Sequence, residues 1–148
     1  MKSITWLLAI ILVLLPVCSC SSPPDTARVT QVIDGDTIII EGGYRVRYIG
    51  IDTPEVHPEL ETCGMEALEA NRKLVEGKEV CLERDVSETD KYGRLLRYVY
   101  VDDVFVNAEL VRQGLAEAKA YPPDTKYQSH LEEMEAEARR AGRGMWAK

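Results

Sequence analysis

The sequence predicts an α+β protein in which five strands form a closed barrel and three helices pack around it. Short runs rich in β-branched and aromatic residues, bounded by Gly, Asp and Pro, indicate the strands. Apolar residues spaced three and four positions apart indicate the helices. The predicted strands are 28–33, 37–41, 44–51, 78–84 and 94–101, and the predicted helices are 64–76, 107–113 and 127–140. A helix between the third and fourth of five strands is the arrangement of an OB-fold barrel.

The first three strands are separated by turn signals. Asp34-Gly35-Asp36 ends the first strand, and Gly42-Gly43 is a hairpin signal between the second and third strands. The third run, 44–51, is rich in β-formers throughout, so we expect one continuous strand there.

The helices have recognisable faces and ends. Ala67, Ala70 and Leu74 share one face of the first helix, and Gly77 stops it before the fourth strand. Asn107 is expected to cap the second helix. The expected buried stripe of the third helix is formed by Leu131, Met134, Ala138 and Ala141, and Trp146 is expected to pack back onto the core.

The N-terminal segment is typical of an export signal. Its apolar run, 4–17, is shorter than the ~20 residues of a membrane-spanning helix, and small and polar residues follow at once. The end of this run resembles a bacterial lipoprotein cleavage box, in which Cys20 would carry the lipid because small Ser19 precedes it. We therefore expect a signal peptide at 1–19, a tether at 20–27, one domain at 28–148, and an extracytoplasmic protein that is anchored to the membrane through Cys20. Ordinary secretion, with cleavage near Ser19 or Ser21, is the alternative.

Composition limits the way in which the domain could bind nucleic acid. The chain of 148 residues carries a formal net charge of −7, whereas a protein that binds nucleic acid through bulk charge is basic. Any phosphate must therefore be bound by local cations, such as a metal ion and a few positioned arginines.

Four carboxylates gather at the ends of neighbouring predicted strands. Asp34 and Asp36 lie in the first turn, and Asp52 and Glu55 follow the third strand. Carboxylates repel one another, so they are crowded mainly where a cation or a reaction needs them. A plain turn is the alternative, above all for Asp34, because Asp and Gly are common turn residues.

The ordered set of motifs IDGDT, VRYIGIDTPE, DKYGR and VNAELVRQGLA, followed by Trp146, resembles the staphylococcal nuclease (thermonuclease) family. The resemblance runs from Arg28 to Trp146. It implies an OB-fold nuclease that needs Ca²⁺ and cleaves DNA and RNA to leave 3′-phosphorylated ends, and we expect it to act as a monomer.

The resemblance also implies roles for the acids. Asp36, Asp52 and the backbone carbonyl of Thr53 would bind Ca²⁺, which prefers hard oxygen ligands. Asp34 would support this metal site, and Glu55 would orient or deprotonate the attacking water.

The arginines and aromatic residues would hold the substrate. By resemblance, Arg47 and Arg94 clamp the scissile phosphate, because guanidinium groups meet phosphate oxygens bidentately. Simple alternation places Arg47 and Asp52 on opposite faces of one strand, so twist or a bulge must bring them together. Two further arginines, Arg45 and Arg97, are expected to face solvent.

Three residues are expected to contact the rest of the nucleotide. Lys91 and Tyr92 match positions that contact a terminal phosphate, and a solvated loop is the alternative for both. Tyr121 is the candidate for stacking on a base, although the segment around it departs from the two-tyrosine pattern of the family.

Cys63 and Cys81 are the two cysteines of the predicted domain. They lack the spacing and the histidines of a zinc site. In an exported protein two such cysteines are expected to pair, so we predict a Cys63–Cys81 disulfide, with two buried free thiols as the alternative.

Two other functions compete with the nuclease. The same fold also serves as a binding module without activity, but binding alone would not need all of Asp36, Asp52, Glu55, Arg47 and Arg94. A lipoprotein that binds Ca²⁺ only for structure would leave the two arginines unexplained.

Overall fold

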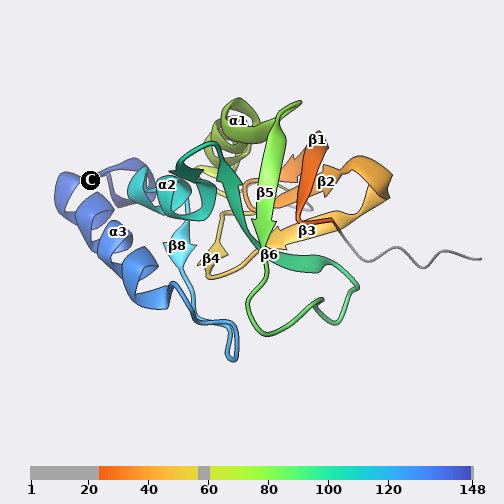
Figure 1. Ribbon diagram of the computed structural model, residues 1–148. Helices are drawn as coiled ribbons and strands as arrows, with labels where there is room; N and C mark the ends of the chain where they lie inside the picture. Colours follow the sequence, from red (N-terminus) through yellow and green to blue (C-terminus); the bar gives the residue numbers. More distant parts are fainter. Residues whose placement is uncertain (1–23, 57–60, 148) are drawn as a thin grey trace, which may run out of the picture.

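The computed structural model describes residues 24–56 and 61–147, and five of its strands form a closed barrel (Figure 1). The strands of one sheet follow the order β3-β2-β1-β5-β6-β7, and a parallel pairing of β3 with β6 closes the ring. The barrel strands are β1 (Thr26–Asp34), β2 (Thr37–Ile40), β3 (Arg45–Tyr48), β5 (Glu79–Glu83) and β6 (Leu95–Val101). This arrangement confirms the α+β fold class with a five-stranded OB-type barrel.

Three α-helices complete the described part of the chain, as predicted. They are α1 (Gly64–Val75), which packs against β1, α2 (Val106–Arg112), which packs against β6, and α3 (Gln128–Ala141), which packs against α2. In Figure 1, α2 and α3 lie together on one side of the barrel. The short elements are β4 (Ile51–Asp52), β7 (Val104–Phe105), β8 (Glu117–Ala118) and the 3₁₀ turns Glu41–Gly43 and Gly144–Trp146.

The predicted third strand is divided into β3 and β4. Gly50 adopts a φ of +78°, a left-handed conformation that favours glycine, and the chain turns there. The amide of Asn107 donates to the carbonyl of Ile49 over 2.9 Å and stabilises the break, so Asn107 lies inside α2 and does not cap it. β4 leaves the barrel and pairs with β8.

The C-terminal packing differs partly from the prediction. Leu131 and Ala138 are buried on α3, whereas Ala141 is exposed because the helix ends there. Trp146 is half-buried, and the guanidinium carbon of Arg139 lies 3.4 Å from the centre of its ring. Its indole therefore packs against α3.

The structure contradicts the predicted Cys63–Cys81 disulfide, because both residues are free thiols. Val80 and Leu82 of β5 point into the core, so the side chain of Cys81 between them points outward and is exposed. Cys63 precedes α1, whose buried face packs inward. The buried free thiols of the alternative interpretation are not found either, since Cys63 is only half-buried.

The expected signal peptide at 1–19 and the lipid attachment at Cys20 lie outside the described residues, as does the first half of the tether, 20–23. Among the residues that are described, no helix is both long enough and apolar enough to cross a membrane.

Candidate functional site

The turn between β1 and β2 places Asp34 and Asp36 at one edge of the barrel. Gly35 lies between them, and a Cβ on it would come within 2.8 Å of the Thr53 side chain and 2.9 Å of Ala67. Only glycine lets the turn lie this close to both neighbours. The turn is therefore packed against the segment that follows β4.

Arg47 forms ion pairs with both carboxylates among the predicted metal ligands. Its Nη1 lies 2.8 Å from Oδ2 of Asp36, and its Nη2 lies 2.8 Å from Oδ1 of Asp52. The break at Gly50 explains how residues that alternation placed on opposite faces can meet, because Asp52 belongs to a separate strand. Arg47 is largely buried, so the contact is shielded from solvent.

Asp36 is the most enclosed of the four acids, with 5% of its surface exposed. Burial raises the pKa of its carboxyl, and Arg47 and the Thr53 N–H oppose this effect. Its Oδ2 accepts a hydrogen bond from the N–H of Thr53 over 3.0 Å, and its Oδ1 accepts one from the Thr37 hydroxyl over 3.0 Å. The hydroxyl of Thr53 is buried without a hydrogen-bond partner.

Glu55 extends outward beside these acids. Desolvation, followed by the charge of Asp34 and of the two predicted ligands, raises its pKa to about 7. Its backbone N–H donates to a carboxylate oxygen of Glu61 over 2.8 Å, and its carbonyl accepts from the N–H of Glu61 over 2.9 Å. The backbone of Glu55 is thus held in place while its side chain stays accessible.

The acids fit a hard divalent cation by the chemistry of their donors. Within 24–56 and 61–147, no three His, Cys, Asp or Glu side chains form a ready-made metal cage. The predicted set has two carboxylates and one backbone carbonyl, and Ca²⁺ completes such sets with water and further oxygens. The pKa values of Asp36 and Glu55 are raised, and a bound cation would stabilise the ionised form of both carboxyls. The Thr53 hydroxyl beside them is buried and lacks a hydrogen-bond partner.

Asp90 positions Arg94. Its Oδ2 accepts from Nε of Arg94 over 2.7 Å, and its Oδ1 accepts from the backbone N–H groups of Tyr92 and Arg94 over 2.9 and 3.0 Å. The Tyr92 ring lies close to two cations, with Nζ of Lys91 5.0 Å and the guanidinium carbon of Arg94 5.5 Å from its centre. Arg94 is engaged through Nε, and in the described part of the chain no hydrogen bond holds its two terminal nitrogens, which could donate to a ligand.

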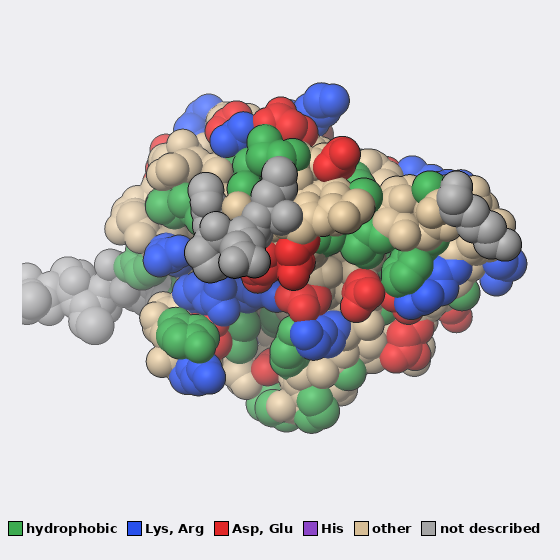
Figure 2. Space-filling model, turned by 180° about the vertical axis from the view of Figure 1, so that it is seen from behind, with side chains coloured by type: hydrophobic (Ala, Val, Ile, Leu, Met, Phe, Trp, Pro, Cys, Tyr) green, Lys and Arg blue, Asp and Glu red, His purple; other side chains and the backbone are tan. Residues whose placement is uncertain are grey.

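A pocket of about 440 Å³ brings the predicted substrate-binding residues together. Arg47 lines it from β3, and the loop before β6 and the segment after β8 form its other walls. The predicted residues among its lining are Arg47, Lys91, Tyr92, Arg94 and Tyr121. On the face shown in Figure 2, basic side chains gather beside acidic ones near the centre. The pocket has the size and the charge of a phosphate-bearing small ligand site.

Asp124 joins two walls of this pocket, and the sequence analysis did not single it out. It is buried, and its Oδ1 accepts from the N–H groups of Val86 and Ser87 over 3.0 and 2.7 Å. The loop that carries Lys91 and Tyr92 is thereby tied to the segment that carries Tyr121. An Asp in an irregular segment gives no periodic signal that would identify it.

Arg97 was expected to face solvent, but it is 4% exposed and forms an ion pair with Glu88. Its guanidinium also donates to the carbonyl of Glu88 over 3.1 Å. It therefore stabilises the loop before β6 from within. Arg45 is exposed, as expected.

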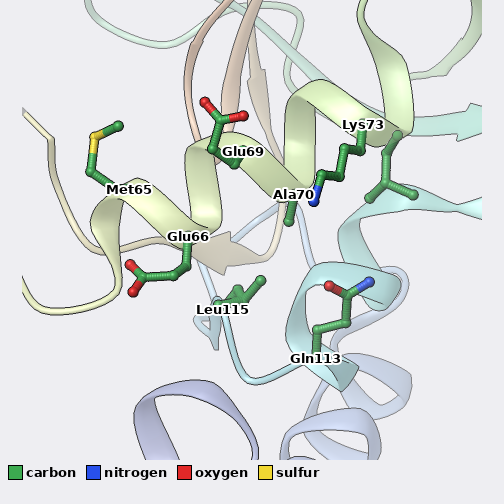
Figure 3. Close-up of a pocket in the computed structure, with 8 residues that line it drawn as sticks. Met65, Glu66, Glu69, Ala70, Lys73, Gln113 and Leu115 are labelled. Carbon is green, nitrogen blue, oxygen red and sulfur yellow. The ribbon is translucent and has the colours of Figure 1, made fainter.

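A second pocket, of about 480 Å³, lies between α1 and the end of α2 (Figure 3). Glu66, Ala70 and Lys73 line it from α1, and Leu115 and Gln113 line it from the opposite side. None of the residues predicted for the site lines this pocket. The candidate site is therefore the pocket that contains Arg47 and Arg94.

Comparisons with known proteins agree with this geometry. Residues 45–148 match the family model described as Staphylococcal nuclease homologue. The protein named Thermonuclease from Staphylococcus hyicus is 38% identical over 128 residues, which cover 82% of this chain and 76% of the relative. The Thermonuclease of Staphylococcus intermedius is 43% identical over 124 residues, covering 80% and 74%. Endonuclease YncB of Bacillus subtilis is 41% identical over 128 residues, covering 80% and 60%.

Proposed function

Because this chain belongs to the staphylococcal nuclease family, we propose that it is a Ca²⁺-dependent nuclease that cleaves DNA and RNA and leaves 3′-phosphorylated ends. Its relatives are named thermonucleases and endonucleases, so the chain is a hydrolase that acts on nucleic acid with a divalent metal. The choice of Ca²⁺ rests on the donor set, which consists of hard oxygens alone. The observation that carries the proposal is that Arg47, bound to both Asp36 and Asp52, lines the same pocket as Arg94.

The acids would hold the cation and the water. Asp36, Asp52 and the Thr53 carbonyl would hold Ca²⁺, which when bound supplies positive charge that stabilises the developing charge on the phosphate. In the metal-free protein, burial and the neighbouring acids raise the pKa of Glu55 to about 7, and a bound cation would lower it, so Glu55 would be ionised and able to accept a proton from water. Water would attack phosphorus while Glu55 takes one of its protons, the bond between phosphorus and the 5′-oxygen would break, and the 5′-oxygen would take a proton from solvent and leave as a hydroxyl.

The cationic residues would bind the phosphate. Arg47 and Arg94 line the pocket and would donate to the non-bridging oxygens, where charge builds in the transition state. Lys91 and Tyr92 would contact a neighbouring phosphate, and Tyr121, which is 41% exposed, would stack on a base.

Digestion of single-stranded DNA with Ca²⁺, with and without a chelator, tests the proposal. Cleavage that the chelator abolishes is expected, and mass spectrometry of the products should find 3′-phosphates. Glu55→Gln should lower turnover by about 10²-fold. Asp36→Ala should raise the Ca²⁺ concentration that gives half the maximal rate, since it removes a ligand.

Arg94→Ala should lower kcat by about 10²-fold, far more than it raises KM. Arg45→Ala is the matched control, because Arg45 is exposed and lines none of the described pockets. Wild-type protein that binds an oligonucleotide in Ca²⁺ but shows no chelator-sensitive cleavage would contradict the proposed nuclease activity. That result would favour a binding module.

We also propose that the protein acts as a monomer outside the cytoplasm, attached to the membrane through a lipid on Cys20. The proposal rests on the N-terminal sequence, in which Cys20 follows an apolar run and a small residue. Changing Cys20→Ser should release the protein from the membrane fraction. A wild type that is already soluble outside the cell would favour ordinary secretion.

A further inference from the structure

Lys119 is held beside the acids by a short antiparallel ladder. Asp52 of β4 pairs with Glu117 of β8, and the backbone N–H of Lys119 donates to the carbonyl of Gly50 over 2.8 Å. Its Nζ lies 2.6 Å from Oδ2 of Asp52 and 5.6 Å from the centre of the Tyr121 ring. Its ammonium group is therefore placed by the backbone at the edge of the candidate metal site.

Both carboxylate oxygens of Asp52 are engaged in this structure. Oδ1 binds Arg47 and Oδ2 binds Lys119. Lys119 is half exposed and makes no hydrogen bond to the other acids of the site, so its side chain can leave Asp52 without breaking the core. Arg47, in contrast, is largely buried and also pairs with Asp36.

The charges of the site explain why a lysine would lie there. When Asp34, Asp36, Asp52 and Glu55 are ionised, their four negative charges face the two positive charges of Arg47 and Lys119. A divalent cation would balance the two negative charges that remain. Without Lys119 the negative excess would be larger, and the site would attract a divalent cation more strongly.

We propose that Lys119 is a tethered counter-charge that competes with the divalent cation for Oδ2 of Asp52 and so weakens metal binding. This inference rests on the proposed function, because it takes Asp52 as a metal ligand. Lys119 stabilises Asp52 in the metal-free protein and moves aside when the cation arrives. The cation concentration at which the enzyme becomes active is thus set partly by a residue that does not bind the metal.

Isothermal titration calorimetry of Ca²⁺ into the metal-free protein tests the proposal. Lys119→Met keeps the apolar stem and removes the charge, and it should bind Ca²⁺ about threefold more tightly, the scale of one exposed ion pair. Lys119→Arg keeps the charge and should bind Ca²⁺ as the wild type does. Lys126→Met is the matched control: the exposed fractions of the Lys126 and Lys119 side chains are 51% and 50%, and Lys126 pairs with Glu83, which is not one of the four acids.

The outcomes separate this proposal from the proposed function. Equal or weaker Ca²⁺ binding by Lys119→Met overturns the competition, even if the wild type cleaves DNA. Absence of Ca²⁺ binding in both proteins overturns it as well, because no cation then competes. Tighter binding by Lys119→Met, together with no chelator-sensitive cleavage by the wild type, supports the competition and overturns the nuclease mechanism instead.

Discussion

Gly64, the first residue of α1, lies directly against the backbone of Glu55. A Cβ at Gly64 would come within 2.6 Å of the Glu55 carbonyl oxygen and 3.3 Å of the Pro54 carbonyl oxygen. Backbone atoms cannot move aside as a flexible side chain can. The backbone of Glu55 can therefore lie this close to α1 only because residue 64 has no side chain.

Gly64→Ala should displace Glu55 and lower kcat by about tenfold or more, since small displacements of catalytic groups are costly. Steady-state cleavage of single-stranded DNA measures this effect. Met65→Ala is the control on the same helix, because Met65 is 41% exposed. An unchanged kcat in Gly64→Ala would mean that the position of Glu55 does not depend on this contact.

Asn71 of α1 connects the helix to the metal-site turn. Its Nδ2 donates to the carbonyl of Asp34 over 2.9 Å, and its Oδ1 accepts from the Tyr48 hydroxyl over 2.8 Å. Asn71 and Tyr48 are both fully buried. Asn71→Leu should lower the free energy of unfolding by about 2–4 kcal/mol, because it removes the partner of the buried Tyr48 hydroxyl and of the part-buried Asp34 carbonyl.

Urea unfolding of Asn71→Leu, Tyr48→Phe and the double variant measures this network. Tyr48→Phe removes one hydroxyl and should cost about 1 kcal/mol. In the Asn71→Leu background, Tyr48→Phe should cost less, because the hydroxyl has already lost its partner. Additive effects in the double variant would contradict the hydrogen bond between them.

The thiols of Cys63 and Cys81 should both react with an alkylating reagent without prior reduction. Cys81 is exposed and should react faster than Cys63, which is half-buried. Peptide mapping by mass spectrometry measures alkylation at each position, and a reduced sample gives the full extent. Alkylation of both cysteines only after reduction would restore the disulfide that the sequence predicted.

Local patterns predicted the barrel well, because each of its strands is marked by its own β-formers and turn residues. The break between β3 and β4 was not predicted, because no local pattern marks it. Ile49 is a β-former, so the run reads as continuous, and the turn at Gly50 is stabilised by hydrogen bonds to distant residues, among them Asn107, 58 positions from Ile49.

The residues predicted for the candidate site belong to motifs, whereas the residues that hold them in place do not. Lys119 contacts an acid 67 positions away, and Asp124 binds N–H groups 37 and 38 positions away. Contacts of this kind arise from the closed fold and leave no period in the sequence. The disulfide prediction failed because the direction of the Cys81 side chain depends on the register of β5.

Asp90→Asn tests whether the negative charge of Asp90 holds Arg94 and the loop before β6 in place. Burial alone would raise the pKa of Asp90, but the hydrogen bonds from Arg94 and from the N–H of Tyr92 outweigh it and hold the pKa below its ordinary value. A carboxyl whose pKa is lower in the folded than in the unfolded protein stabilises the fold above the unfolded pKa, and this stabilisation is lost as the pH falls through the folded pKa. Asp90→Asn should therefore lower the free energy of unfolding by about 1–2 kcal/mol at pH 7, and the difference from wild type should shrink as the pH falls below about 4. Urea unfolding between pH 3 and pH 7 measures both effects, with the exposed Asp103→Asn as the control. A difference that stays constant across this range would show that the charge of Asp90 does not hold Arg94 in place.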